Sequence, residues 1–388
     1  MNGKKPGIRF PEYKDDWQHT KLSELLGEAK KRNEDLKYGK DEVLSVSGEL
    51  GIVNQIEHLG RSYAGVSVHQ YHVVEVGDIV YTKSPLKANP YGIIKLNKGK
   101  AGIVSTLYAV YKVNNKTCYG PWLEYYFSLD ANTNRYLRPL VKKGAKNDMK
   151  INNAYVLHDR IFAPSIPEQK RIASFITVVD KKIAELKQKK ALLEQYKKGL
   201  MQKLFSQELR FKDENGKEFP KWEKKKLGDV ISKTSSNIAA NNIEENFGEY
   251  IIYGASGVLK RVNFFRESEK YISIVKDGAG VGRVFLCEAN TSVLGTLDIL
   301  KPIESNLEFL YCLLQQINFS KYVTGSTIPH IYYSDYKAEK VLMPSMKEQT
   351  KIANFLSAID DKINRTENQI QQTQEWKKGL LQNMCVNG

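Results

Sequence analysis

Two segments of the chain carry apolar residues at helical spacing within an otherwise charged sequence. In residues 164–206 and 344–388 the apolar positions recur every three or four residues, which gives a heptad-like stripe. The positions that we expect to pack against a second helix are Ile176, Val179, Ile183, Leu186, Leu193, Leu200, Leu356, Ile359, Ile363, Ile370 and Leu380. At about 1.5 Å per residue, a helix of about 40 residues would be about 60 Å long. The pattern predicts two long helices that each need a partner helix.

The two segments are copies of one another. The sequence PSIPEQ at residues 164–169 returns as PSMKEQ at residues 344–349, a shift of 180 positions. In this one register, 15 of the 42 residues from 164 to 205 are identical to their counterparts. Both copies begin with a Ser-x-x-Glu pattern, which predicts a capping box in which the glutamate reaches back to the start of the helix.

The two stripes are the natural partners of each other. Because the helices are related and are joined through a globular region, we expect them to pack antiparallel about a pseudo-twofold axis. The alternative is that each stripe packs only on its own neighbouring domain. Neither stripe is complete alone, because polar residues interrupt it at Lys190, Lys197, Thr366, Thr373 and Lys377.

A glycine occupies the same place in both copies, at Gly199 and Gly379. Each costs its helix about 1 kcal/mol relative to alanine. The repetition predicts either a close backbone contact or a bend at this position.

The regions between the helices have the pattern of mixed α/β domains. Gly and Asn separate the expected strands, which are 43–46, 71–76, 78–82, 92–96, 102–113, 250–253, 271–275, 283–287 and 296–300. Short helices are expected at 121–129 and 307–316. Residues 122–125 are weakly similar in sequence to residues 306–309, so we expect these segments to correspond. The predicted organisation is a first domain at 1–163, a helix at 164–206, a second domain at 207–343 and a helix at 344–388.

Composition narrows the class of partner. The 388 residues contain 59 Lys and Arg against 44 Asp and Glu, a formal net charge of +15. Such a surplus favours a polyanionic partner, either nucleic acid or an acidic membrane face. No apolar run approaches the roughly 20 residues of a membrane span, and we expect no signal peptide. Four scattered cysteines fit a reducing cytoplasm.

Local strings that suggest catalysis have plainer interpretations. The glycines at 278, 280 and 282 lead into an expected strand rather than a helix, which favours a turn over a nucleotide site. The sequence NPYG at 89–92 lacks the second proline of the adenine methyltransferase motif, which favours a turn. The six histidines show no metal-binding spacing beyond His69-x-x-His72, for which a surface or packing role is favoured.

The chain resembles the specificity subunit of Type I restriction-modification systems. The resemblance rests on the duplicated Glu-Gln helices, on the KKGL sequences at 197–200 and 377–380, and on the Phe-Pro…Trp…Lys-Leu openings, which are Phe10-Pro11, Trp17 and Lys21-Leu22 in the first half and Phe219-Pro220, Trp222 and Lys226-Leu227 in the second. It covers nearly the whole chain. It implies an α+β fold with two mixed α/β target-recognition domains in pseudo-twofold arrangement, separated by two long antiparallel helices.

The resemblance also implies a non-catalytic subunit that binds double-stranded DNA. Each domain would recognise one half of an asymmetric, bipartite site, and two modules on one face of B-DNA must lie about one helical turn apart or a multiple of it. Two modification subunits would dock on the helices and methylate adenine N6 from S-adenosylmethionine. Two restriction subunits would add translocation and cleavage that use ATP and Mg. No cofactor or metal is expected in this chain, whose expected location is the bacterial or archaeal cytoplasm.

Candidate DNA contacts are loop residues, because phosphates need Lys, Arg or hydroxyl groups and base edges need polar or aromatic side chains. In the first domain we expect Lys83, Ser84, Lys87, Asn89, Lys142, Lys143, Lys146 and Asn147. In the second we expect Lys276, Arg283, Thr327, His330, Tyr332 and Tyr333. An ordinary surface or packing role is the alternative for each.

Two other classes of protein remain as alternatives. A self-sufficient adenine methyltransferase would need a cofactor fold and a Pro-Pro-aromatic motif, neither of which the sequence shows. A coiled-coil scaffold with a basic surface would bind protein rather than DNA, and salt-sensitive DNA binding would distinguish it.

Overall fold

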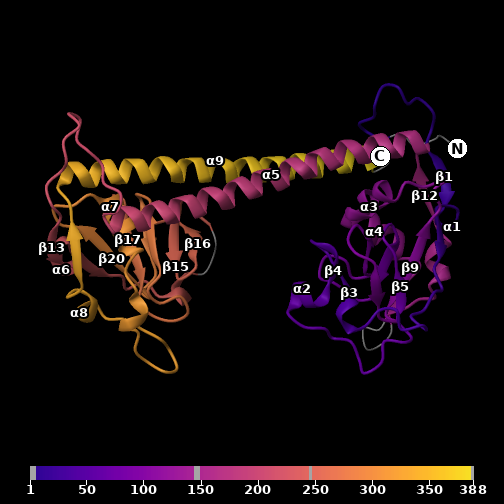
Figure 1. The fold of residues 1–388 in the computed structure, drawn as a ribbon, viewed down its shortest axis with the longest axis horizontal. Helices are drawn as coiled ribbons and strands as arrows, with labels where there is room; N and C mark the ends of the chain where they lie inside the picture. Colours follow the sequence, from indigo (N-terminus) through magenta and orange to yellow (C-terminus); the bar gives the residue numbers. More distant parts are fainter. Residues whose placement is uncertain (1–5, 144–148, 244–246, 386–388) are drawn as a thin grey trace. The chain divides into compact units, whose positions relative to one another are not determined.

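The computed structural model describes residues 6–143, 149–243 and 247–385. The chain forms two compact units (Figure 1). Unit 1 consists of Met1–Leu186 with Gln369–Gly388, and unit 2 consists of Lys187–Asn368. The division falls within the two long helices, so each helix contributes one half to each unit.

The predicted long helices are confirmed as α5, Ile166–Phe205, and α9, Met346–Cys385. In unit 1 the first half of α5 contacts the second half of α9, through Asp180 and Lys377. In unit 2 the second half of α5 contacts the first half of α9, through Lys197 and Asp360. The two helices therefore run antiparallel.

Unit 1 is built around a four-stranded antiparallel sheet in the order β2-β9-β6-β7. These strands are β2 Leu26–Glu28, β9 Tyr108–Val113, β6 Ile79–Thr82 and β7 Ile93–Leu96. Smaller pairs surround the sheet: β1 Gln18–Lys21 with β12 Arg160–Ala163, β3 Leu44–Ser47 with β4 Gly51–Asn54, β5 His72–Val74 with β8 Gly102–Val104, and β10 Lys142–Lys143 with β11 Met149–Lys150. Its helices are α1 Leu22–Leu25, α2 Gln55–Leu59, α3 Gly120–Ser128 and α4 Asp130–Leu137, with 3-10 turns η1 Lys40–Glu42 and η2 Ala154–Leu157.

Unit 2 repeats this sheet as β14-β20-β17-β18, again antiparallel. These strands are β14 Ile231–Ser235, β20 Leu297–Pro302, β17 Tyr271–Val275 and β18 Val284–Cys287. The remaining strands are β13 Glu223–Lys226 with β21 Lys340–Met343, and β16 Gly257–Val262, β15 Tyr250–Gly254 and β19 Thr291–Val293. Its helices are α6 Leu227–Val230, α7 Leu307–Leu314 and α8 Tyr333–Tyr336, with 3-10 turns η3 Ala240–Asn242 and η4 Phe319–Tyr322.

The expected strands are found with one clear difference. The single strand predicted at 102–113 is two strands, β8 and β9, because the chain turns between them and Tyr108 N donates to Ser105 O. Eleven of the described strands were not expected, most of them only two to four residues long, so that each carries little strand pattern: β1, β2, β4, β10, β11, β12, β13, β14, β16, β19 and β21.

The apolar stripes pack on each other and on the domains, so both packing partners considered from the sequence are used. In unit 1 the cluster that holds Ile176, Val179 and Ile183 also holds Leu380 of α9 and Trp122 of α3. In unit 2, Leu356 and Ile359 join Met201 and the sheet, with Leu200 and Ile363 half-buried beside them. Leu186 and Ile370 are buried outside these clusters, and Leu193 is half-buried.

Of the two explanations considered for the paired glycines, the close backbone contact is wrong and the bend stays a prediction. A Cβ added at Gly199 or Gly379 would meet no described atom within 4 Å, and both helices continue through these positions. Nothing in the structure explains why glycine occupies both. Among the described residues, no helix is long and apolar enough to cross a membrane.

Candidate nucleic-acid interface

The glutamate of each Glu-Gln pair anchors the opening of its own domain. Glu168, which is 1% exposed, accepts from Arg9 Nε at 2.7 Å and Arg9 Nη2 at 2.8 Å, and from Trp17 Nε1 at 3.2 Å. Glu348 accepts in the same bidentate way from Arg210, at 3.2 and 2.7 Å. The bond to Glu168 raises the pKa of Arg9. The predicted capping boxes are wrong, because both carboxylates bind these arginines and Ser345 Oγ has no hydrogen-bond partner in the described structure.

The glutamine of each pair holds the start of a short helix. Gln169 Oε1 accepts from Tyr119 N at 2.7 Å, next to α3, and Gln349 Oε1 accepts from Asn306 N at 2.9 Å, next to α7. These bonds show that Tyr119 in the first copy of the repeat corresponds to Asn306 in the second. The weak correspondence expected between residues 122–125 and 306–309 is therefore wrong by three positions, about one helical turn.

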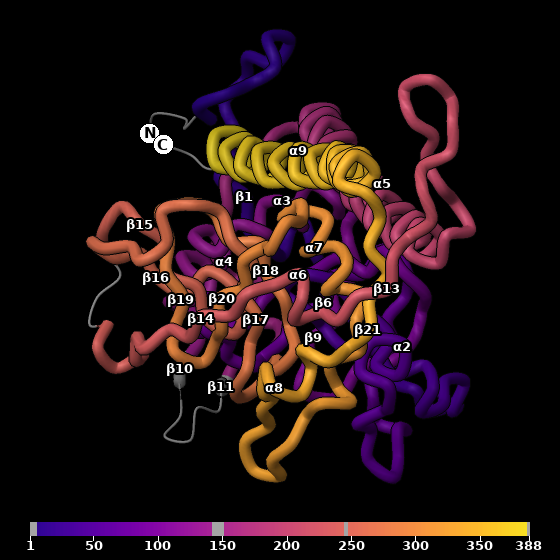
Figure 2. The backbone as a smooth tube through the Cα atoms, turned by 90° about the vertical axis from the view of Figure 1, so that its left-hand side faces the viewer, coloured from indigo at the N-terminus to yellow at the C-terminus, as the bar shows by residue number. Residues whose placement is uncertain are grey.

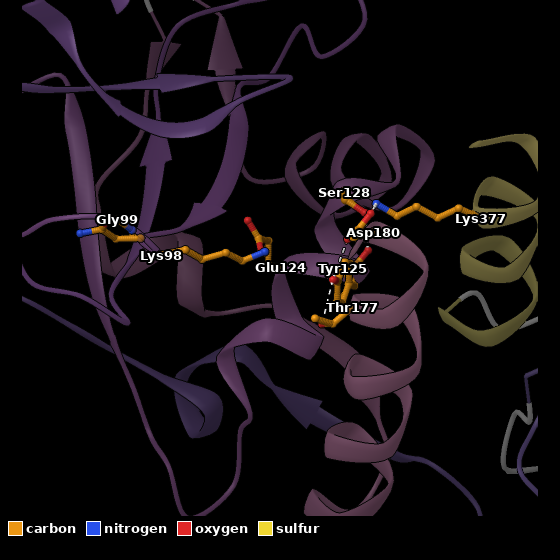
Figure 3. Close-up of polar contacts among 9 residues, drawn as sticks. Lys98, Gly99, Glu124, Tyr125, Ser128, Thr177, Asp180 and Lys377 are labelled. Carbon is orange, nitrogen blue, oxygen red and sulfur yellow. Dashed lines mark hydrogen bonds and ion pairs between the residues drawn. The ribbon is translucent and has the colours of Figure 1, made fainter. Parts of the chain in front are cut away.

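A cluster of polar contacts joins α3 to both long helices in unit 1 (Figure 3). Lys377 Nζ lies 2.5 Å from Asp180, and Tyr125 OH donates to Asp180 Oδ2 at 2.8 Å. On the other side of Tyr125, Lys98 Nζ lies 2.5 Å from Glu124. Burial raises the pKa of Tyr125, so its hydroxyl remains a donor at neutral pH. In unit 2 the corresponding pair is Lys197 and Asp360, at 2.6 Å.

The long helices thus form the scaffold, and the candidate DNA contacts lie on loops. Lys83, Ser84, Lys87 and Asn89 lie together in the loop between β6 and β7. Ser84 and Lys87 are exposed, and Lys83 is half-buried with a pKa lowered by that burial. Asn89 is buried and donates to Asp130 at 3.0 Å, so it braces the loop from inside.

The matching loop of unit 2, between β17 and β18, holds two of the residues expected there. Lys276 Nζ lies 3.3 Å from Asp298, and exposed Arg283 donates to Ala255 O at 3.0 Å. The three glycines between them have φ angles of +86, +96 and +83°, and the segment leads into β18. It is a turn, as the sequence indicated.

A second loop is also shared by the two units. In unit 1 it is the β10–β11 hairpin, where only the backbones of Lys142 and Lys143 are described, and Lys146 and Asn147 lie outside the described residues. In unit 2 it is the hairpin closed by Thr324 and His330, which holds Thr327 at its exposed tip. Figure 2 looks onto unit 2 and shows this hairpin on the side away from α9. Apart from Tyr332 and Tyr333, the expected residues that the structure describes therefore fall on or directly beside two matching pairs of loops.

The two tyrosines expected beside this hairpin differ. Tyr332 is 54% exposed and packs against the His330 ring. Tyr333 donates from its hydroxyl to Ile231 O at 3.0 Å and packs on Tyr336, so it supports the fold from inside. Sequence reasoning missed Ile328, which is 62% exposed at the hairpin tip; an apolar side chain in a Gly- and Pro-bounded turn was the available signal.

The chain is similar to known restriction proteins along its whole length. Residues 220–374 match the family described as the Type I restriction modification DNA specificity domain. A Methanocaldococcus jannaschii protein described as the "Putative type I restriction enzyme MjaX specificity subunit" is 24% identical over 97% of this chain and 94% of its own length. The MjaVIII specificity subunit of the same organism is 27% identical over 47% of each chain.

Solved structures agree in fold. The S subunit of a Type I restriction-modification system from M. genitalium superposes with a TM-score of 0.62 over 99% of this chain and 100% of its own, at 15% identity. A chain from a study of assembly and conformational transition in the type I R-M system gives 0.54, over 94% and 96%, at 16% identity. The family match over residues 220–374, the relative matched over 97% of this chain and the repeated scaffold together show that the chain is similar to the specificity subunits of Type I restriction-modification systems.

Proposed function

We propose that this chain recognises an asymmetric, bipartite DNA site, with one half-site for each domain. The observation that carries the proposal is the repeat itself: the same sheet order, Glu-Gln anchors and pair of loops occur in both units, while the loop residues differ. A repeated scaffold with dissimilar loops suits two unlike half-sites. The net charge of +15 supports a phosphate backbone as the partner.

The long helices serve in this proposal as the spacer between half-sites and as the docking surface for two modification subunits. Large apolar side chains are exposed on them, as expected of a surface that a protein covers: Val178, Leu192, Tyr196 and Trp376. Two restriction subunits complete the complex.

We assign the chemistry of the complex to these partners. S-adenosylmethionine for N6-adenine methylation belongs to the modification subunits, and ATP and Mg belong to the restriction subunits. The glycine-rich segment of this chain forms a turn before a strand, which suits a loop scaffold rather than a cofactor site. The proposed location is the cytoplasm, in keeping with four buried, unpaired cysteines.

Methylome sequencing tests the proposal directly. Cells that carry the modification subunit with this chain should show N6-methyladenine in a two-part motif, and deleting this chain should remove that motif. Purified chain with its modification subunit should also prefer a duplex with the motif over a scrambled duplex. Equal binding to both duplexes, with an unchanged methylome, would refute the proposal.

A further inference from the structure

The hairpin tip of unit 2 is held in one conformation by its own backbone. Thr324 and His330 exchange two backbone hydrogen bonds of 2.9 Å, which close the loop of residues 325–329. Gly325 has a φ of +86°, and a Cβ there would lie 2.4 Å from the carbonyl oxygen of Ile328. Only glycine fits this turn, so the loop is ordered before it meets a ligand.

The glycine-rich turn between β17 and β18 fixes the hairpin to the sheet. Gly278 N donates to Pro329 O at 2.8 Å, and Ile331 N donates to Lys276 O at 2.9 Å. Lys276 is itself paired with buried Asp298 on β20. The hairpin tip is therefore held in a fixed position by hydrogen bonds to the sheet, as a recognition element requires.

The chemistry of the tip does not suit the phosphate backbone. In a chain with 59 Lys and Arg, residues 322–336 contain none. The tip instead exposes the apolar Ile328, next to exposed Thr327 and near Tyr332. An exposed apolar side chain on a basic protein is better suited to the thymine methyl group on a groove floor than to phosphate.

His330 has a defined hydrogen-bonding direction. Its Nδ1 lies 3.1 Å from Ile328 O, and a carbonyl oxygen only accepts, so Nδ1 carries the proton. In the neutral ring, Nε2 is then an acceptor. In the major groove an A·T pair presents a donor, the adenine N6 amino group, and the thymine methyl group lies on the far side of the thymine O4 acceptor.

We propose that the hairpin of residues 324–330 recognises an A·T base pair of the second half-site in the major groove, with Ile328 on the thymine methyl group and His330 Nε2 accepting from adenine N6. This inference rests on the proposed function and adds the base chemistry of one element.

The test removes one apolar partner of the proposed contact at a time, either the thymine methyl group or the Ile328 side chain. The full-length chain with its modification subunit is titrated with two duplexes that carry the two-part motif identified by methylome sequencing. One duplex has thymine and the other has deoxyuridine in the second half-site. Deoxyuridine lacks only the C5 methyl group, and losing its burial should weaken wild-type binding about threefold to fivefold. Ile328→Ala should bind the thymine duplex about as weakly and should not distinguish the two duplexes. Ile303→Ala, at an apolar position of unit 2 that is 40% exposed, is the matched control and should behave as wild type.

The outcomes separate the inference from the proposed function. If wild-type complex prefers the motif but deoxyuridine and Ile328→Ala have no effect, the hairpin assignment is wrong and the function stands. If wild-type complex shows no preference for the motif, the function itself fails. With His330→Ala, the methylated motif should accept more than one base at one position of the second half-site, and only there. If the motif is unchanged and all duplexes bind more weakly, His330 contacts a phosphate instead.

Discussion

Lys197 of α5 forms an ion pair with Asp360 of α9 at 2.6 Å, and the residues 180 positions from each, Lys377 and Asp180, form the same pair at 2.5 Å. Each helix thus supplies an aspartate from its first half and a lysine from its second half. Two copies of one helix satisfy both pairs only when they run antiparallel in this register. The lysines that interrupt the apolar stripes are therefore part of the packing.

The two ion pairs should contribute unequally to stability. Asp360→Asn should cost about 0.5 kcal/mol, because these carboxylates are partly exposed and water screens the pair. Asp180→Asn should cost about 1 kcal/mol more, since the amide oxygen of asparagine would accept from the hydroxyl of Tyr125 more weakly than the carboxylate does. Equilibrium unfolding of both variants measures the difference. In a Tyr125→Phe background, the stability losses caused by Asp180→Asn and Asp360→Asn should be closer to each other. Equal losses from these two substitutions in the wild-type background would contradict the prediction.

Removing a glutamate of the Glu-Gln pair should destabilise its domain strongly. Glu348 is fully buried against Arg210, so Glu348→Ala leaves the guanidinium without its carboxylate and should cost about 3 kcal/mol in the free energy of unfolding. Lys270→Ala, which breaks an exposed contact with Glu288 at 3.0 Å in the same unit, is the control and should cost less than about 0.5 kcal/mol. Similar losses in chemical denaturation would show that the buried pair has no special role.

The paired helix glycines should tolerate alanine. Because no described atom lies within 4 Å of the added Cβ, Gly199→Ala and Gly379→Ala should each stabilise the protein by about 1 kcal/mol. Thermal unfolding measures the gain. If the isolated variants gain stability but fail to assemble with a modification subunit, the glycines serve that contact; a loss of stability would contradict the prediction itself.

Stability should fall on mild acidification because of His72. This side chain is 3% exposed, and burial followed by the charges of Arg32 and Lys83 lowers its pKa to about 4. Between about pH 6.5 and 4 the unfolded chain binds a proton that the folded chain does not, so stability decreases by up to about 1.4 kcal/mol per pH unit as pH falls.

Denaturant unfolding between pH 7.5 and 5 checks this prediction. His72→Gln should flatten the pH dependence, whereas His58→Gln, at an exposed position, should leave it unchanged. A slope that is the same in all three proteins would assign the pH dependence to other groups.

The loop between β6 and β7 should supply phosphate contacts. Lys87 is exposed there, so Lys87→Ala should weaken binding to all duplexes alike and lower the slope of log affinity against log salt by about 1. Lys217→Ala, at an exposed lysine in the segment between α5 and β13, is the control. A change in the methylated motif would instead show that Lys87 contacts a base.

Much of the scaffold could be predicted because it depends on local pattern and on duplication. The long helices follow from their spacing and from a register that holds for 42 residues. The Glu-Gln anchors could not be predicted, because Arg9 lies 159 positions from Glu168 and nothing near the glutamate indicates that partner. The local sequence pattern predicted a capping box, but in the structure the glutamate forms a buried bidentate ion pair with an arginine.

The loops were predicted in place but not in detail. Polar residues after strands predicted both matching pairs of loops, yet the pattern could not show that Asn89 and Tyr333 point inward, since that depends on Asp130 and on Ile231 O. Ile328 was missed for the opposite reason: apolar residues are usually assigned to cores, and exposure at a turn is a property of the folded backbone.

The last turns of α9 complete the core of unit 1, where Leu380, Leu381, Met384 and Cys385 pack with Trp122 and Ile172, and Ile8 N donates to Asn383 O. The ribosome makes the strands of this unit first but must translate almost to residue 385 before their core can close. Unit 2 is contiguous in sequence, so all its residues have been translated by residue 368. The domain begun first is thus finished last, and a released chain that ends near residue 368 would have all the residues of the second domain and an open core in the first.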